Sequence, residues 1–328
     1  MTIRCTSVIV CTYNRARLLP RVIGQLRAQE YPAMAFEIIV VDNGSTDETA
    51  HVVERFVSEP GIPVRYVFES RAGITFARNR GAEEAHYPFL AYLDDDCSVS
   101  SDWLAHLISG FALDKSVVIV AGQIVVNFDQ QKRPAWLSPK SERWLGAYTH
   151  PGSETRLLAE FPVYICEANM ALTRAAWEAA GGFLGMDQFG NPHVAAQEIR
   201  IILKKLKKLG GKAAFVPEAV VNHHSGMPTR LWLLKRAYWH GVSDGILDYF
   251  LNRFSWSSVV VHVAIDMAAL LVFFCLSLCF FMLFDQATAL YHLLRATARL
   301  GRLLSELRLV GDWSAVRSWE AAHGQVYT

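Results

Sequence analysis

The sequence predicts an α/β protein built on a mostly parallel, doubly wound sheet with flanking helices, followed by a helical C-terminal region. Two observations predict the sheet: short apolar, β-branched runs recur, and segments with helical spacing of apolar residues alternate with them. A third observation is that polar loops follow these runs, and open α/β sheets bind ligands at the carboxyl ends of their strands. The four runs expected as strands are Thr6–Cys11, Phe36–Val41, Val64–Phe68 and Phe89–Leu93.

Helices are expected over residues 18–26, 52–56 and 76–85, and Pro20 is tolerated because it falls in the first turn of its helix. Another strand is expected over 117–126. Right-handed crossovers place the carboxyl ends of the first four strands on one edge of the sheet. The residues expected together at that edge are Thr12–Arg15, Asp42, Arg71–Gly73 and Asp94–Asp96.

Composition limits the classes of function. The chain has 328 residues, 52% of them hydrophobic, so it can bury a large core. Its net charge of +1 gives no general attraction for nucleic acid. The six cysteines show no paired metal-ligand spacing and no disulfide framework, which suits a reducing compartment. The N-terminal residues do not have the pattern of a signal peptide.

Asp94, Asp95 and Asp96 directly follow an expected buried strand. Adjacent carboxylates repel one another, so a cation is needed for all three to stay charged. Oxygen ligands suit Mg²⁺ or Mn²⁺, and Mg²⁺ often shares its shell with substrate phosphates. The other interpretation is an acidic turn that caps a helix, since Ser100 and Asp102 lie close by. The residues alone leave both open.

Asp42 ends the second strand, where it can accept a hydrogen bond from a nucleotide base or a ribose hydroxyl. An aspartate of an Asp-Asn-Gly-Ser turn is the alternative interpretation. The sequence contains no GxGxxG after the first strand and no Walker loop. A nucleotide would therefore be recognised mainly by side chains.

Four motifs in order resemble the family 2 glycosyltransferases, of the kind that build bacterial polysaccharides. They are Ser7–Arg15 (SVIVCTYNR), Val40–Asp47 (VVDNGSTD), Gly73–Gly81 (GITFARNRG) and Leu93–Asp96 (LDDD). The resemblance covers about residues 6–225. It implies the GT-A fold and an inverting transfer of a sugar from a nucleotide-diphosphate-sugar, with a UDP-sugar favoured.

The resemblance also implies roles on the donor side. The nucleotide-binding residues would be Thr12, Tyr13, Asn14, Arg15, Asp42, Arg78, Asp94 and Asp95. For Arg78, a solvated helix face is the alternative. The family's DXD motif corresponds to Asp94-Asp95-Asp96, with Asp94 near the ribose and the metal and Asp96 on the divalent cation. His223 matches a family histidine that reaches the metal or the diphosphate, although a lone histidine is more often structural.

On the acceptor side, the resemblance implies that Glu167 and Asn169 line the site; simple edge-strand polarity is the alternative. The Trp- and Pro-rich segment Pro134–Pro151 could stack aromatic rings on an acceptor or form a local hydrophobic plug. The plug is the favoured interpretation.

The catalytic base departs from the family pattern. The family usually has Glu-Asp at the start of a helix, whereas this chain has Glu198 followed by Ile199. Glu198 is therefore the expected base, and Asp187 is the reserve candidate. Stabilisation of the helix N-terminus is the alternative role for Glu198.

The tail is expected to associate with a membrane. Residues 267–284 are eighteen residues without a charge and would span about 27 Å as a helix. Residues 286–310 then place leucines on one face, with Arg295, Arg299 and Arg302 opposite, as in a basic amphipathic helix at a membrane surface. A single crossing would move these arginines outside, so an in-plane or re-entrant anchor is at least as well supported. A helical dimer interface is the alternative.

These inferences predict a GT-A catalytic domain over 1–228, with a nucleotide-binding half (1–126) and an acceptor half (127–228), and a helical region over 229–328. The protein would be a metal-dependent hexosyltransferase at the cytoplasmic face of the inner membrane, acting on a lipid-linked or glycan acceptor. The sequence gives no expectation for the oligomeric state. A nucleotidyltransferase and a sugar-nucleotide-binding subunit that has lost its base are the alternatives.

Overall fold

The computed structural model describes residues 3–129, 131–149, 154–158, 165–184, 198–252, 256–283 and 285–306. The chain divides into two compact units. The first contains Met1–Asn127, Gly146–Leu184 and Glu198–Ser225, and the second contains Phe128–Leu145, Gly185–Gln197 and Gly226–Thr328. Residues 128–145, which the sequence assigned to the acceptor half, thus group with the C-terminal helices.

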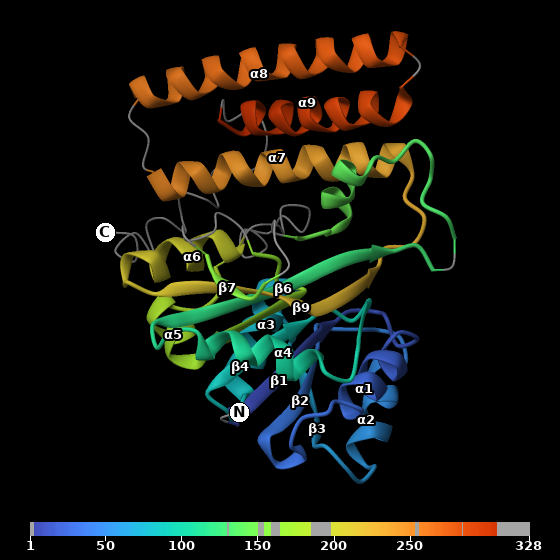
Figure 1. The fold of residues 1–328 in the computed structure, drawn as a ribbon, viewed down its shortest axis with the longest axis vertical. Coiled ribbons are helices and arrows are strands. Elements are labelled where there is room, and N and C mark those ends of the chain that lie inside the picture. The colour runs from blue at the N-terminus through green and yellow to red at the C-terminus, as the bar shows by residue number, and fades with distance from the viewer. Residues whose placement is uncertain are drawn as a thin grey trace. The chain divides into compact units, whose positions relative to one another are not determined.

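The first four strands of the first unit form the predicted parallel arrangement (Figure 1). They are β1 (Thr6–Thr12), β2 (Phe36–Asp42), β3 (Val64–Phe68) and β4 (Phe89–Leu93), in the order β3-β2-β1-β4. Every residue of β1 and β2 is buried, as expected for apolar strands covered on both faces.

The second half of the sheet makes it mixed. β8 (Asn169–Thr173) pairs antiparallel with both β4 and β6 (Val117–Asn127), and β6 runs parallel to β9 (Lys212–His224). β5 (Cys97–Val99) and β7 (Arg156–Leu157) pair antiparallel with β9. The α/β architecture with flanking helices is confirmed.

The helices of this unit include the three predicted ones. They are α1 (Leu19–Arg27), α2 (Thr49–Val57), α3 (Ile74–Glu84), α4 (Trp103–Ser109), α5 (Arg174–Ala180) and α6 (Glu198–Lys208), with short 3-10 segments at Ala33–Ala35 and Gly110–Ala112. Gly81 lets α3 approach the sheet closely, because a Cβ there would lie 2.4 Å from Cγ2 of Ile9.

The second unit contains a short 3-10 segment, Pro139–Leu145, and three long helices: α7 (Arg230–Asn252), α8 (Trp256–Met282) and α9 (Gln286–Glu306). Figure 1 shows α9 lying between α7 and α8, and it contacts both helices. Small residues permit this packing: a Cβ on Gly241 would lie 1.8 Å from the backbone oxygen of Ala298.

The predicted apolar run 267–284 lies mostly within α8, but this helix begins earlier and includes the charged Asp266. Asp266 is buried, and two arginines of α9 compensate its carboxylate. Arg299 pairs with it, and Nε of Arg302 lies 3.0 Å from its Oδ2. Arg295 lies over the ring of Phe273, 3.9 Å from its centroid. The arginines expected to face lipid headgroups therefore contact α8 instead, which corrects the basic amphipathic interpretation of α9.

Candidate active site

The loops that follow β1 and β2 are joined by Asn14. Its backbone adopts a left-handed conformation (φ 52°), which asparagine tolerates better than most residues. Its N–H donates to Oγ of Ser45 (2.9 Å), and its Oδ1 accepts from the N–H of Thr46 (2.7 Å). The predicted nucleotide loop, residues 12–15, is therefore held at the carboxyl end of β2.

Asn43 extends this network to the loop after β3. Its Nδ2 donates to the carbonyl of Arg71 (2.7 Å), and its Oδ1 accepts from the N–H of Gly73 (2.9 Å). Gly73 has a φ of 141°, a conformation that favours glycine. These bonds bring the ends of β1, β2 and β3 together, as the sequence predicted for this edge of the sheet.

Asp42 lies at the centre of this edge and is only 2% exposed. Its carboxylate accepts hydrogen bonds from the N–H of Ser45 (2.8 Å) and from the hydroxyl of Tyr66 (2.9 Å). Burial, and then the contact with Asp42, raises the pKa of Tyr66, so this hydroxyl stays a donor. The turn interpretation of Asp42 is thus satisfied in the structure, and its contact with a nucleotide stays a prediction.

The three aspartates after β4 have different surroundings. The Asp94 side chain is partly exposed, but its partial removal from water raises its pKa against the opposing charge of Arg78. Burial raises the pKa of Asp95 to about 6 despite Arg15. Burial also disfavours the charge of Asp96, but hydrogen bonding to His223, with the charges of His223 and Arg15, lowers its pKa to about 2. Asp96 is therefore the member of the triplet that is most strongly held as a carboxylate.

His223 reaches Asp96 through the pairing of β5 with β9, in which Cys97 lies opposite His223. Its Nε2 is 3.2 Å from Oδ1 of Asp96. Among the described residues, the ligand atoms of Asp96, Cys97 and His223 all lie within 4.8 Å of one another. The structure thus brings together two of the three predicted metal ligands, and β4 carries Asp94 to the same turn.

Arg78 is buried in α3, with 8% of its surface exposed, so the solvated-face interpretation of this residue is wrong. Its guanidinium lies 3.8 Å from Oδ1 of Asp94 and 3.9 Å from Oε1 of Glu167. Arg78 therefore links the donor-side turn to the expected acceptor side.

Asn169 does not line an accessible site, which corrects that expectation. It is fully buried at the start of β8, and its Oδ1 accepts from Nε1 of Trp103 (3.0 Å). Its Nδ2 donates to the carbonyls of Gln123 (2.9 Å) and Ala219 (2.7 Å). Both ends of the amide are occupied, so Asn169 holds β6, β9 and α4 together. Glu167 is also buried but keeps its contact with Arg78.

Sequence reasoning missed the role of Asn79. Its Nδ2 donates to the carbonyl of Phe183 (2.8 Å), and its Oδ1 accepts from the N–H of Phe183 (2.8 Å) and from Nε1 of Trp177 (3.1 Å). The Ala-Arg-Asn motif thus has two functions: Arg78 reaches the acidic turn, and Asn79 fixes the chain after α5.

The aromatic side chains near residue 140 fit the plug interpretation. Trp144 is buried and packs edge-on against His240 within the second unit, and Tyr148 is buried against Phe215 within the first. Burial lowers the pKa of His240 to about 3, so this ring is neutral. For the two candidate bases, the structure describes only the backbone of Glu198, at the start of α6, and Asp187 lies outside the described residues.

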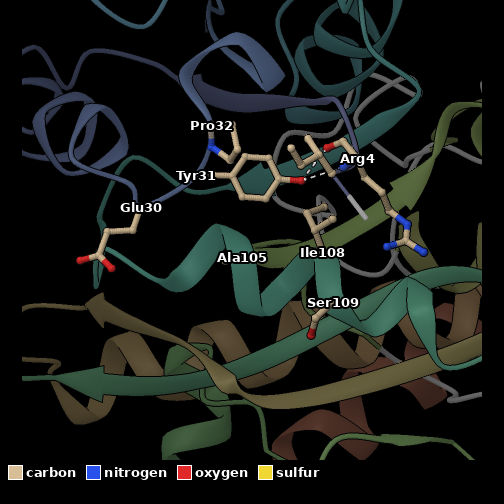
Figure 2. A pocket seen from close by; sticks show the side chains of 8 residues that line it. Arg4, Glu30, Tyr31, Pro32, Ala105, Ile108 and Ser109 are labelled. Atoms are coloured by element: carbon tan, nitrogen blue, oxygen red, sulfur yellow. Dashed lines mark hydrogen bonds between the residues drawn. The ribbon is translucent and has the colours of Figure 1, made fainter. Parts of the chain in front are cut away.

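A pocket exists elsewhere in the first unit, near the start of β1 (Figure 2). Ile3, Arg4, Tyr31 and Ile108 line it, and the Tyr31 hydroxyl donates to the carbonyl of Arg4 (2.7 Å). It lies at the amino end of β1, whereas the loops described above follow its carboxyl end. This pocket is therefore separate from the candidate active site.

The sequence matches the model of the family described as Glycosyl transferase family 2 over residues 7–178, which is more than half of the chain. The chain belongs to this family. It is a glycosyltransferase, and the predicted resemblance is confirmed.

Two curated relatives agree with this assignment, and one solved structure shares the fold. A glucosyl-dolichyl phosphate glucuronosyltransferase of Haloferax volcanii is 26% identical over 74% of this chain and 77% of its own length. The succinoglycan biosynthesis protein ExoM of Rhizobium meliloti is 28% identical over 73% of each chain. The mannosyltransferase PcManGT of Pyrobaculum calidifontis, solved with GDP-Man and Mn²⁺, has a TM-score of 0.56 over all of this chain and 82% of its own, at 20% identity. This last likeness shows the GT-A fold.

Proposed function

We propose that this glycosyltransferase moves a hexosyl group, with inversion, from a UDP-sugar to a hydroxyl of a lipid-linked or glycan acceptor, and that it depends on Mn²⁺ or Mg²⁺. The observation that carries the proposal is the acidic turn after β4, where Asp96 contacts His223 from β9 beside Asp94. Carboxylates with one imidazole are a donor set that suits these cations.

The residues present fit a divalent cation. Asp96 and His223 supply an oxygen and a nitrogen close together, and Asp94, with a side chain 36% exposed, adds an accessible carboxylate. The thiol of Cys97 lies near the same atoms but is fully buried. Asp94, Asp96 and His223 would hold the ion. When bound, it would neutralise the diphosphate and make it a better leaving group.

The side chains of this enzyme would bind and orient the two substrates. The loop of residues 12–15 and Asp42 would hold the nucleotide, while Arg78 keeps Asp94 in place from its buried position. Glu198 would remove the proton from the acceptor hydroxyl. The hydroxyl oxygen would then bond to the anomeric carbon from the side opposite the diphosphate, whose bond to that carbon breaks, releasing a nucleoside diphosphate.

A donor panel tests this function. The full-length protein, with Mn²⁺, is incubated with UDP-, GDP- and dTDP-sugars, and released nucleoside diphosphate is measured with and without glycan or polyprenyl-phosphate-sugar acceptors. We expect UDP release with one UDP-sugar, and loss of release on adding EDTA. Release of pyrophosphate would indicate a nucleotidyltransferase. Donor binding without turnover would indicate a binding subunit that has lost its base. Ile199, which stands where the family usually has Asp, is the feature that keeps this alternative open.

We also propose that α8 lies in the plane of a membrane, at its cytoplasmic face. By length and composition, α8 could cross a membrane over Val261–Met282, where its mean hydropathy is 2.5. Its exposed apolar side chains cover about 200° of the helix circumference at 100° per residue. They are Val261, Ile265, Met267, Leu271, Val272, Phe274, Leu278, Phe281 and Met282. A partner helix would cover a stripe of roughly 100°, so lipid fits this arc better than a second copy does.

The packing of α9 argues against a crossing. Arg295 and Arg299 lie against α8, so a spanning α8 would bring both into the hydrocarbon core. An arginine without an acidic partner costs about 2.5–3.5 kcal/mol or more there. An in-plane α8 would place its exposed arc in the lipid and keep α9 on the aqueous side.

A charged substitution among the exposed apolar side chains of α8 tests the membrane proposal. Leu271→Glu should weaken binding to vesicles of anionic phospholipid by about tenfold or more, because a carboxylate would enter apolar surroundings. Flotation measures the bound fraction, and Leu113→Glu, at an exposed apolar residue of the first unit, is the matched control. Equal binding by both variants would contradict the proposal. A dimer that Leu271→Glu dissociates, without vesicle binding, would support the dimer interface instead.

A further inference from the structure

The acidic turn already contains a positive charge from the protein. One nitrogen of Arg15, Nη1, lies 2.6 Å from Oδ1 of Asp95 and 2.8 Å from Oδ2 of Asp96. Both are charge-assisted hydrogen bonds, which are roughly twice as strong as neutral ones. Asp96 is also the carboxylate that His223 contacts. A single guanidinium therefore neutralises the carboxylate that is proposed to meet the divalent cation.

Arg15 and the two aspartates differ in how freely they can move. The Arg15 side chain is 47% exposed, whereas those of Asp95 and Asp96 are 5% and 17% exposed. The backbone before Arg15 is fixed by the hydrogen bonds of Asn14 to the second loop. Arg15 is therefore the most exposed of the three partners, on a long side chain that follows a backbone held by these hydrogen bonds.

The donor diphosphate, which would also enter this site, is a suitable partner for Arg15. The planar guanidinium has five N–H donors and binds phosphate in a two-pronged geometry. Arg15 lies in the loop after β1, beside the turn where a donor diphosphate would meet its cation. The diphosphate would offer Arg15 a new partner at the moment when the cation takes over Asp96.

We propose that Arg15 is a positioning residue that occupies the cation site until substrate arrives: it holds Asp95 and Asp96, and exchanges places with the divalent cation when a nucleoside diphosphate binds. The proposal rests on the proposed function, because it needs the cation and the nucleotide to share this site. It makes the binding of the two cooperative, since each provides what the other needs to displace Arg15.

The proposal predicts positive cooperativity between Mn²⁺ and UDP. Without nucleotide, Mn²⁺ must compete with the guanidinium for Asp96, so it binds weakly. With UDP, Arg15 gains the diphosphate as a partner and Mn²⁺ binds more tightly. In Arg15→Gln the competitor is gone. Mn²⁺ alone should then bind more tightly than it does to the wild type, and UDP should enhance that binding less.

The test measures free Mn²⁺ by electron paramagnetic resonance while full-length protein is titrated, with and without UDP. For Arg15→Gln, we expect the dissociation constant of Mn²⁺ alone to fall by about tenfold or more, because the substitution removes a unit positive charge that lies 2.8 Å from Oδ2 of Asp96. The enhancement by UDP should shrink by a similar factor. Arg15→Lys keeps the charge and should behave more like the wild type. Arg27→Gln removes a partly exposed ion pair with Glu59, away from the acidic turn, and is the matched control.

The possible failures can be told apart. If Mn²⁺ alone binds equally to wild type, Arg15→Gln and Arg15→Lys, while UDP still enhances binding, the role of Arg15 is wrong and the metal-dependent function stands. If Mn²⁺ does not bind to the wild type with or without UDP, the metal dependence fails, and this proposal fails with it. Weaker binding of Mn²⁺ alone to Arg15→Gln would also contradict the proposal, because it would make Arg15 a support of the site rather than a competitor.

Discussion

Asp96→Asn should reduce sugar transfer on the order of 10²–10³-fold, the range found when a group that stabilises developing charge is removed. The substitution keeps the shape of the side chain but removes the carboxylate that contacts both His223 and Arg15. Initial rates of UDP release at saturating donor, together with a Mn²⁺ titration, measure the effect. Affinity for Mn²⁺ in the presence of UDP should fall with the rate.

Asp102→Asn is the matched control for this variant. Asp102 is an exposed carboxylate that precedes α4 and accepts a hydrogen bond from Ser100, outside the candidate site. Its loss should leave the transfer rate and the Mn²⁺ affinity unchanged. Wild-type behaviour of Asp96→Asn in both measurements would remove the acidic turn from the proposed chemistry.

Glu198→Gln should lower the transfer rate by about 10²–10⁴-fold while donor binding is kept, because a general base contributes on that scale and an amide cannot accept the proton. The comparison is Asp187→Asn, which removes the reserve candidate. Rates are measured with saturating donor and acceptor, and donor binding by calorimetry. Glu178→Gln, at an exposed position of α5, controls for loss of a surface carboxylate.

Three other results would change the assignment of the base. Full activity in Glu198→Gln with a large loss in Asp187→Asn would make Asp187 the base. Full activity in both variants would exclude both residues. A Glu198→Gln protein that is less stable but equally active would show that this carboxylate acts only on the N-terminus of α6.

The parts of the fold that sequence could predict are those encoded locally. β1 and β2 are continuous apolar runs that end in polar loops, so their type, their direction and the shared edge at Asp42 follow from the pattern. The antiparallel insertion of β8 between β4 and β6 depends on pairing between distant segments, which leaves no periodic signal. The start of α8 was also hidden, because Asp266 interrupts the apolar run and its arginine partners lie one helix later.

The candidate site also combines features that the sequence predicted with features that only the structure shows. The motifs pointed to particular residues, and the structure brings Asp96, His223 and Arg15 together at one turn. Their roles on a donor stay predictions. The burial of individual side chains, which the motifs do not reveal, distinguishes between the alternative interpretations of Asn169 and Arg78. Asn169 fits an acceptor-side motif, yet its amide is used entirely by Trp103 and two backbone carbonyls. Arg78 could have been a surface residue, but it is buried beside Asp94.

The pairing of β5 with β9 has a consequence for biosynthesis. Asp96 leaves the ribosome early, whereas its partner His223 is at the end of the last strand of the sheet. A nascent chain that lacks β9 has the acidic turn but lacks the imidazole. The proposed cation site is therefore complete only when β9 has joined the sheet.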